Sequence, residues 1–143
     1  MTRAAEPADR QVWPPELLAA VSNLPDHSRL VVALSGGLDS VALLNLAVAV
    51  HGHARVEAIH INHRLQANSE DMEALCRRLC DGLGVALTVQ RLEWNSGIPG
   101  SGIEEQARER RYDIFRQLLD SGDLLLMAHH GDDQAETVLF RML

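Results

Sequence analysis

The segment from Leu30 to Val50 holds the residues best suited to chemistry. An apolar run leads into Ser35-Gly36-Gly37-Leu38-Asp39-Ser40, and a second apolar run follows. A strand that turns into a helix through two glycines points several backbone N–H groups at one spot, where the helix dipole adds partial positive charge. Glycine permits close approach and positive φ, which we expect at Gly36 and Gly37. The pattern predicts a turn that binds phosphate.

The polar side chains of this turn narrow the chemistry. The Ser35 and Ser40 hydroxyls can donate hydrogen bonds to phosphate oxygens, whereas the Asp39 carboxylate is suited to Mg²⁺. The chain has 13 basic residues, all of them arginine, so a Walker A lysine and a Schiff-base lysine are excluded. The turn also differs from the GxGxxG dinucleotide motif, and Ser35 precedes the glycines, unlike the serine of a GxSxG nucleophile elbow.

Two later segments carry further candidate residues. "AIHINHRL" places His60 and His63 at the end of an apolar run, where they could instead serve only as hydrogen-bonding residues of a strand end. "GIEEQARERRY" puts Glu104, Arg108 and Arg111 on one face of a predicted helix. That face could bind an anion, or it could be a solvated stripe with i,i+4 ion pairs.

A third segment, "AHHGDDQAET", gathers the titratable side chains of His129, Asp132, Asp133 and Glu136. Asp132 could simply cap a helix. A zinc site built from His129, His130, Asp132 and Asp133 is disfavoured. Neighbouring residues rarely point at one ion, and no further His or Cys at metal-ligand spacing completes the set.

Strands must alternate with helices to position these residues. Short apolar runs predict strands at 30–34, 56–61, 85–92 and 124–128, and helical patterns lie at 14–24, 40–51, 69–82, 103–120 and from Asp133 to the end. Asn68 is a candidate N-cap and Gly82 a candidate stop for the third helix. This order predicts an α/β fold with a parallel sheet covered by helices on both faces. Ligands then bind at the carboxyl ends of the strands, on the same edge as the loop over 95–102.

Composition limits the class of protein. The 143 residues suffice for about one domain, and we divide them into a leader with a short helix, residues 1–28, and the α/β domain, residues 29–143. The sequence stops inside a helical pattern, so we expect it to be part of a longer protein. It has two cysteines, no signal-peptide core and no apolar run of about 18 residues, which predicts a cytoplasmic protein without a membrane partner. A net charge of −7 excludes a broad basic surface for nucleic acid on this chain.

The motifs together resemble a known family. "SGGLDS" matches the SGGxDS signature of the PP-loop ATPases, and the three later segments, in this order, resemble those of the tRNA(Ile)-lysidine synthetase family over residues 30–143. The resemblance implies that ATP is cleaved between its α- and β-phosphates and adenylates the C2 oxygen of the wobble cytidine in the CAU-anticodon isoleucine tRNA. An amine of free lysine then displaces AMP. It also implies tRNA-binding domains beyond this chain and a possible homodimer of the full-length protein.

The resemblance further implies roles for individual residues. The turn from Ser35 to Ser40, Leu38 included, would hold the nucleotide, with His60 beside the adenine. Asp39 and Asp133 would share Mg²⁺, and Arg108 would stabilise charge on the α-phosphate or hold the tRNA backbone.

Candidate substrate residues complete the implied set. Asp132 or Glu136 would bind the lysine ammonium or take its proton, and Arg111 and His129 are further candidates. One departure is that Leu65 is followed by Gln66, where many relatives carry arginine.

Three alternatives remain open. A PP-loop tRNA-thiolating enzyme usually needs a Cys-x-x-Cys pair, whereas Cys76 and Cys80 are four residues apart beside leucines and are predicted to be core residues. A PP-loop amidating enzyme would act on a small molecule. A nucleotide-binding module without turnover would bind ATP but release no AMP, so lysine-dependent AMP release distinguishes it from a ligase.

Overall fold

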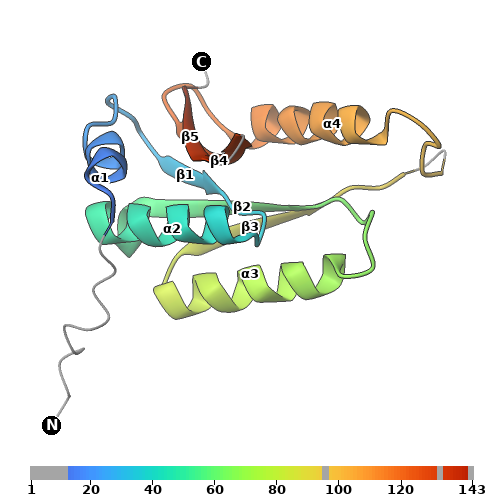
Figure 1. Ribbon diagram of the computed structural model, residues 1–143, viewed down its shortest axis with the longest axis horizontal. Coiled ribbons are helices and arrows are strands. Elements are labelled where there is room, and N and C mark those ends of the chain that lie inside the picture. The colour runs from blue at the N-terminus through green and yellow to red at the C-terminus, as the bar shows by residue number, and fades with distance from the viewer. Residues whose placement is uncertain (1–12, 95–96, 132–133, 142–143) are drawn as a thin grey trace, which may run out of the picture.

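The protein forms a central five-stranded sheet in the strand order β3-β2-β1-β4-β5 (Figure 1). The computed structural model describes residues 13–94, 97–131 and 134–141. The first four strands are parallel, and β5 pairs antiparallel with β4. The strands are β1 (Leu30–Ala33), β2 (Val56–Asn62), β3 (Ala86–Arg91), β4 (Leu124–Gly131) and β5 (Gln134–Arg141).

Helices cover both faces of the sheet, as the alternating pattern predicts. Helices α2 and α3 lie on one face and α4 lies on the other (Figure 1). The helices are α1 (Pro15–Ser22), α2 (Leu38–His51), α3 (Ser69–Leu83) and α4 (Ile103–Leu118), with a short 3₁₀ turn, η2 (His53–Arg55). None of the helices in the described part of the chain is long and apolar enough to cross a membrane.

Two hydrophobic clusters show how the strands are buried. Along β1, Leu30 and Val32 join the cluster that includes residues of α1, α2 and α3, whereas Val31 joins the cluster built around Phe115 of α4. Successive strand residues point to opposite faces, so one strand contributes to both clusters. In β4, residues 124–127 are at most 4% exposed. The predicted parallel sheet, buried on both faces, is therefore confirmed.

The boundaries of α3 differ slightly from the prediction. Asn68 occupies the N-cap position, but its side chain makes no capping hydrogen bond. The helix does not stop at Gly82: it runs to Leu83, and Gly84 ends it with a φ of +72°. Glycine takes this left-handed conformation without a Cβ penalty, which is why a helix commonly ends there.

The helix predicted from Asp133 onward is wrong, because residues 134–141 form β5. The sequence "TVLF" within this segment, Thr137 to Phe140, is rich in β-branched and aromatic residues, which favour strands. Without β5, the outer backbone N–H and C=O groups of β4 would lack partners, and the antiparallel ladder satisfies them. Tertiary pairing therefore overrides the helical spacing. The leader expected at the start of the chain lies outside the described residues.

A buried carboxylate joins the amino ends of β1 and β4. Arg29 donates hydrogen bonds to Asp123 from Nε at 3.0 Å and Nη2 at 2.5 Å, and to Glu57 at 3.2 Å. Burial opposes ionisation of Asp123, but the Arg29 hydrogen bond and the Asp120 backbone N–H together lower its pKa. The pair fixes the start of the strands, opposite to the edge where the site lies.

The α4 face depends on Phe115, which is 1% exposed. We expect Phe115→Ala to lower the free energy of unfolding by about 3–5 kcal/mol, because it removes a large side chain and leaves a cavity. Urea denaturation measures this. The control is Ile98→Ala at a side chain that is 58% exposed, where we expect a change within about 0.5 kcal/mol. Equal effects of the two substitutions would contradict the assignment of Phe115 to the core.

Candidate nucleotide site

The Ser35–Ser40 turn connects β1 to α2 and is held together by the Ser40 hydroxyl. Ser40 Oγ accepts hydrogen bonds from the backbone N–H groups of Ser35 at 3.1 Å and Gly36 at 3.2 Å. It also accepts one from the Ser35 hydroxyl at 3.0 Å and donates one to the Gly37 carbonyl at 2.9 Å. The Gly37 N–H donates to Ser35 Oγ at 3.2 Å. Ser40 is buried and orders the turn from inside, with its one hydroxyl proton donated to the Gly37 carbonyl, so a hydrogen bond from Ser40 to phosphate stays a prediction.

The two glycines of the turn do different things. Gly36 has a φ of +96°, and a Cβ there would come within 2.8 Å of Met72 Cε and 3.5 Å of Cys76 Sγ. Gly37 has a φ of −71° at the N-cap of α2, so the expected positive φ is wrong at that position. An N-cap residue adopts extended dihedrals, which any residue can reach. The conformational need for glycine is therefore at Gly36.

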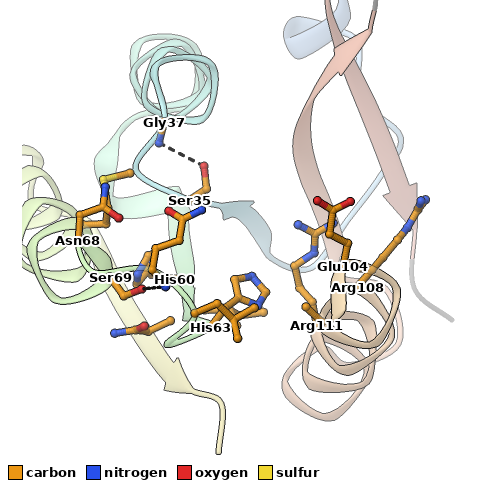
Figure 2. Close-up of a pocket in the computed structure, with 15 residues that line it drawn as sticks. Ser35, Gly37, His60, His63, Asn68, Ser69, Glu104, Arg108 and Arg111 are labelled. Carbon is orange, nitrogen blue, oxygen red and sulfur yellow. Dashed lines mark hydrogen bonds between the residues drawn. The ribbon is translucent and has the colours of Figure 1, made fainter. Parts of the chain in front are cut away.

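A cavity of about 530 Å³ opens at the carboxyl ends of β1 and β2, beside this turn. Figure 2 shows residues of α4 on one side and residues of the turn, the end of β2 and the start of α3 on the other. The lining includes Ser35, Gly37, His60, His63, Asn68, Ser69, Met72, Glu104, Arg108 and Arg111. Ligands of open α/β sheets bind at this edge.

His60 is both a strand-end hydrogen-bonding residue and part of the cavity wall. Its Nδ1 lies 2.8 Å from the Leu34 carbonyl oxygen, which can only accept, so Nδ1 carries a proton. In the neutral ring, Nε2 is then an acceptor, and this buried atom has no partner within the described part of the chain. The cavity can therefore bind a ligand group that donates N–H or O–H to His60.

His63 and Arg111 bring two more buried, unpartnered atoms to the same cavity. These are His63 Nδ1 and Arg111 Nε, neither of which has a hydrogen-bond partner among the described residues. Burial, and then the positive charge of Arg111 and the neighbouring His60, lower the pKa of His63. The ring is thus held neutral at physiological pH, with a lone pair available. A ligand that both donates and accepts hydrogen bonds fits this wall.

The predicted stripe on α4 faces the cavity. Glu104, Arg108 and Arg111 all contribute to its lining (Figure 2). Neither Glu104 nor Arg108 takes part in an ion pair in the part of the chain that the structure describes. Arg108 and Arg111 lie 5.8 Å and 5.7 Å from the Tyr112 ring. Because Arg108 and Arg111 both line the cavity, this wall is suited to an anion.

The other predicted site residues lie in the first turn of α2, on β4 and β5, or outside the described residues. Leu38 begins α2 and is 88% exposed, and Asp39 follows it, half-buried, in the first turn of the helix. His129 on β4 and Glu136 on β5 are directly opposite each other in the antiparallel ladder. Asp132 and Asp133 lie outside the described residues.

Comparison with known proteins identifies the family of this fold. The profile of the PP-loop domain family matches residues 13–143. The chain belongs to the PP-loop family. ATP binding follows from this membership.

Curated relatives carry a more specific name. The chain is 45% identical over 115 residues to the tRNA(Ile)-lysidine synthase of Pseudomonas putida, covering 78% of this chain and 26% of the relative. It is 41% identical over 133 residues to the enzyme of the same name from Pseudomonas syringae, covering 91% and 29%. The chain thus spans less than a third of the length of these PP-loop relatives.

Solved structures support the fold. An NH3-dependent NAD synthetase from Campylobacter jejuni superposes with a TM-score of 0.54 at 17% identity, over 77% of this chain and 50% of that one. A U34-tRNA thiolase from Methanococcus maripaludis superposes with a TM-score of 0.55 at 16% identity, over 71% and 40%. At these identities the likeness concerns the fold alone.

The two cysteines of this PP-loop domain behave as core residues. Cys76 and Cys80 are at most 1% exposed and belong to the cluster under α2 and α3. Burial raises the pKa of each thiol to about 11, so both stay protonated at neutral pH. Protonated, buried thiols are poor nucleophiles and poor metal ligands.

Sequence reasoning missed a polar cluster at the cavity, in which the buried Asn62 and Glu73 are joined by the exposed Arg91. The Asn62 amide donates to Glu73 at 3.2 Å, and Arg91 donates two hydrogen bonds to the same carboxylate, at 2.9 Å and 2.7 Å. Asn62 and Arg91 are also Cα partners in the β2–β3 ladder. Only "INH" following a buried strand could have signalled Asn62, because Glu73 and Arg91 look like ordinary charged residues in the sequence.

The positive φ of Gly36 generates a first prediction. We expect Gly36→Ala to destabilise the fold by about 1–3 kcal/mol and to weaken ATP binding at least about tenfold, because alanine resists the left-handed conformation that shapes the turn. Calorimetric titration with ATP and urea denaturation measure the two effects. The control is Gly82→Ala in α3, where a Cβ meets nothing within 4 Å and alanine should stabilise the helix by about 0.5–1 kcal/mol. Unchanged ATP affinity in Gly36→Ala would remove the turn from the binding site.

The charge of Glu73 generates a second prediction, on pH. The Arg91 hydrogen bond outweighs burial and lowers the pKa of Glu73 from 4.5 to about 2. The ionised carboxylate therefore stabilises the fold fully above about pH 5, and this contribution is lost as the pH falls from about 4.5 to about 2.

We expect Glu73→Gln to lower the free energy of unfolding by about 1–2 kcal/mol at pH 7. This value is discounted for solvent screening, because the Arg91 side chain is exposed. The difference from the parent protein should narrow between pH 5 and pH 3 in urea denaturation. The exposed Glu105→Gln serves as the matched control. A difference that stays constant across this range would contradict the ionised state of Glu73.

Proposed function

We propose that this chain is the ATP-using part of an enzyme that joins free lysine to the wobble cytidine of the CAU-anticodon isoleucine tRNA. The observation that carries the proposal is the 41–45% identity to proteins named tRNA(Ile)-lysidine synthase, over 78–91% of the chain. The cavity supports it, because it combines a turn suited to phosphate with guanidinium groups on the opposite wall. The chain covers only 26–29% of these relatives, so the activity is proposed for the whole protein and not for this chain alone.

The reaction has two bond-forming steps. The C2 oxygen of the cytidine bonds to the α-phosphorus of ATP, and pyrophosphate leaves. An amine of lysine then bonds to C2, the C2–O bond breaks, AMP leaves, and the amine loses a proton. Both steps develop negative charge on phosphate oxygens, where Arg108 and Arg111 can stabilise it. Arg108 could also hold the tRNA backbone.

In this proposal the nucleotide lies along the cavity. The Ser35–Ser40 turn holds the phosphates through backbone N–H groups at the start of α2. The base and ribose lie toward the end of β2, where His60 Nε2 accepts a hydrogen bond from an amino or hydroxyl group.

We propose that Asp39 helps to hold Mg²⁺ at this turn, although it lies in the first turn of α2 and is not among the residues that line the cavity. Mg²⁺ in phosphate sites is usually bound by one or two carboxylates plus phosphate oxygens and water. Asp39 supplies such a carboxylate two residues beyond Gly37, which lines the cavity, and we propose Asp133 as the second. The ion would neutralise the polyphosphate.

The lysine-binding residue is proposed from the segment after β4. Asp132 or Glu136 would bind the ammonium or take its proton, and His129 stands opposite Glu136 in the β4–β5 ladder. A homodimer of the full-length protein and a cytoplasmic location remain predictions.

One experiment tests the function directly. The protein from the full reading frame is incubated with Mg·ATP, lysine and an unmodified isoleucine tRNA transcript, and the anticodon oligonucleotide is weighed. We expect a gain of one lysine residue, with AMP release that depends on lysine. If AMP is released only when a sulfur donor replaces lysine, the protein is a tRNA-thiolating enzyme. If ATP binds but no AMP is released, the protein is a nucleotide-binding module without turnover.

A substitution of Asp39 tests the proposed metal site. We expect Asp39→Ala to reduce AMP release by roughly 10²–10³-fold without unfolding the protein, because a ligand of the charge-neutralising ion is lost. The control is Asp81→Ala, an exposed aspartate near the end of α3. Retained turnover in Asp39→Ala would exclude Asp39 from the metal site.

A further inference from the structure

The chain makes an unusual turn where β2 ends at the cavity. Arg64 has a φ of +55°, and it is the one non-glycine residue with positive φ among the described residues. This conformation costs a non-glycine residue about 1–2 kcal/mol, so neighbouring contacts must hold it. The turn directly follows His63, whose ring lines the cavity.

Asn62 supplies the local contact that holds the turn. Its Oδ1 accepts a hydrogen bond from the Arg64 backbone N–H at 2.9 Å, a side-chain-to-backbone bond that stabilises tight turns. The side chain is 2% exposed, so no water competes for the amide. The backbone on both sides is also fixed: the Leu92 N–H donates to the Asn62 carbonyl at 2.9 Å, and Trp94 Nε1 donates to the His63 carbonyl at 2.8 Å.

Glu73 determines which way the Asn62 amide points. An ionised carboxylate only accepts, so the Asn62 NH₂ group must face Glu73 and Glu70, at 3.2 and 3.4 Å, and Oδ1 must face Arg64. Arg91 in turn holds Glu73 with two hydrogen bonds. Elements β2, α3 and β3 thus converge on a single amide.

The result of this arrangement is a defined position for His63. Its Nδ1 is buried without a hydrogen-bond partner among the described residues, as is Arg111 Nε, and both residues contribute to the cavity lining. Leaving two buried polar atoms unsatisfied costs free energy, which a bound ligand would recover. A polar network that spans three elements and fixes the backbone next to His63 is typical of a supporting shell around a binding site.

We propose that Asn62, oriented by the Glu73–Arg91 pair, is a positioning residue that presents His63 to the nucleotide in the cavity. The identity of the ligand rests on the proposed function, whereas the positioning rests on the geometry. Asn62 also lines the cavity, but its amide hydrogen bonds are made to Glu70, Glu73 and the Arg64 backbone, so in this proposal it acts on binding through His63.

A double-mutant cycle tests this in the full-length protein, with ATP affinity measured by calorimetric titration in Mg²⁺. We expect His63→Ala and Asn62→Ala each to weaken ATP binding about tenfold, and the double variant to bind no more weakly than His63→Ala alone. Asn45→Ala on α2, which also loses one amide hydrogen bond to the backbone, is the control and should bind ATP normally.

The contrary outcomes are distinct. Losses that multiply to about 100-fold in the double variant, or normal affinity in Asn62→Ala, would overturn the positioning role, since a purely structural residue acts independently of His63. If Asn62→Ala does not fold, Glu73→Gln takes its place in the same cycle and should again lose its effect in the His63→Ala background. A protein that binds ATP and shows the cycle but adds no lysine to tRNA would refute the proposed function alone. A protein that binds no ATP would refute both.

Discussion

The candidate site depends on the conformation of the Ser35–Ser40 turn, because backbone N–H groups can bind a phosphate together only when they converge. The buried Ser40 hydroxyl supplies this constraint by bonding to the backbone at both ends of the turn. Gly36 makes it sterically possible, since the backbone there passes against Met72 and Cys76 of α3. The serine oxygens satisfy the N–H groups without any ligand, so the turn is shaped by the protein itself. The Ser35, Gly36 and Gly37 N–H groups are therefore already used, and the phosphate contact that we propose falls to the N–H groups in the first turn of α2.

The wall of the cavity formed by α4 is positioned by apolar packing and by contacts with the segment after β3. Helix α4 is packed on the sheet through Phe115 and is joined to the segment after β3, where Arg110 lies 4.8 Å from the Trp94 ring and donates to the Glu93 carbonyl at 2.6 Å. These contacts place Arg108 and Arg111 across from the turn. In a chain with a net charge of −7, such local placement of arginine determines where an anion can bind.

Buried polar groups at the end of β2 connect stability to function. His60 bonds to the Leu34 carbonyl, as expected of a residue at a strand end, and it also lines the cavity, so its role in binding stays a prediction. Asn62 and Glu73 are fully used in the protein, whereas His63 and Arg111 keep one unpartnered atom each. Residues with satisfied hydrogen bonds therefore lie next to residues with an unpartnered atom at the end of β2.

The sequence by itself determined the features that depend on neighbouring residues. These include the four parallel strands, which alternate with helices along the chain, the glycine turn before α2, and the helical spacing that puts Glu104, Arg108 and Arg111 on one face. Only the tertiary structure decided the rest. β5 replaces the predicted helix because the edge of β4 needs hydrogen-bond partners, and Asn62, Glu73 and Arg91 meet because α3 and β3 pack beside β2. Spacing predicts contacts within one element, but partners that come from distant segments are chosen by pairing and burial in three dimensions.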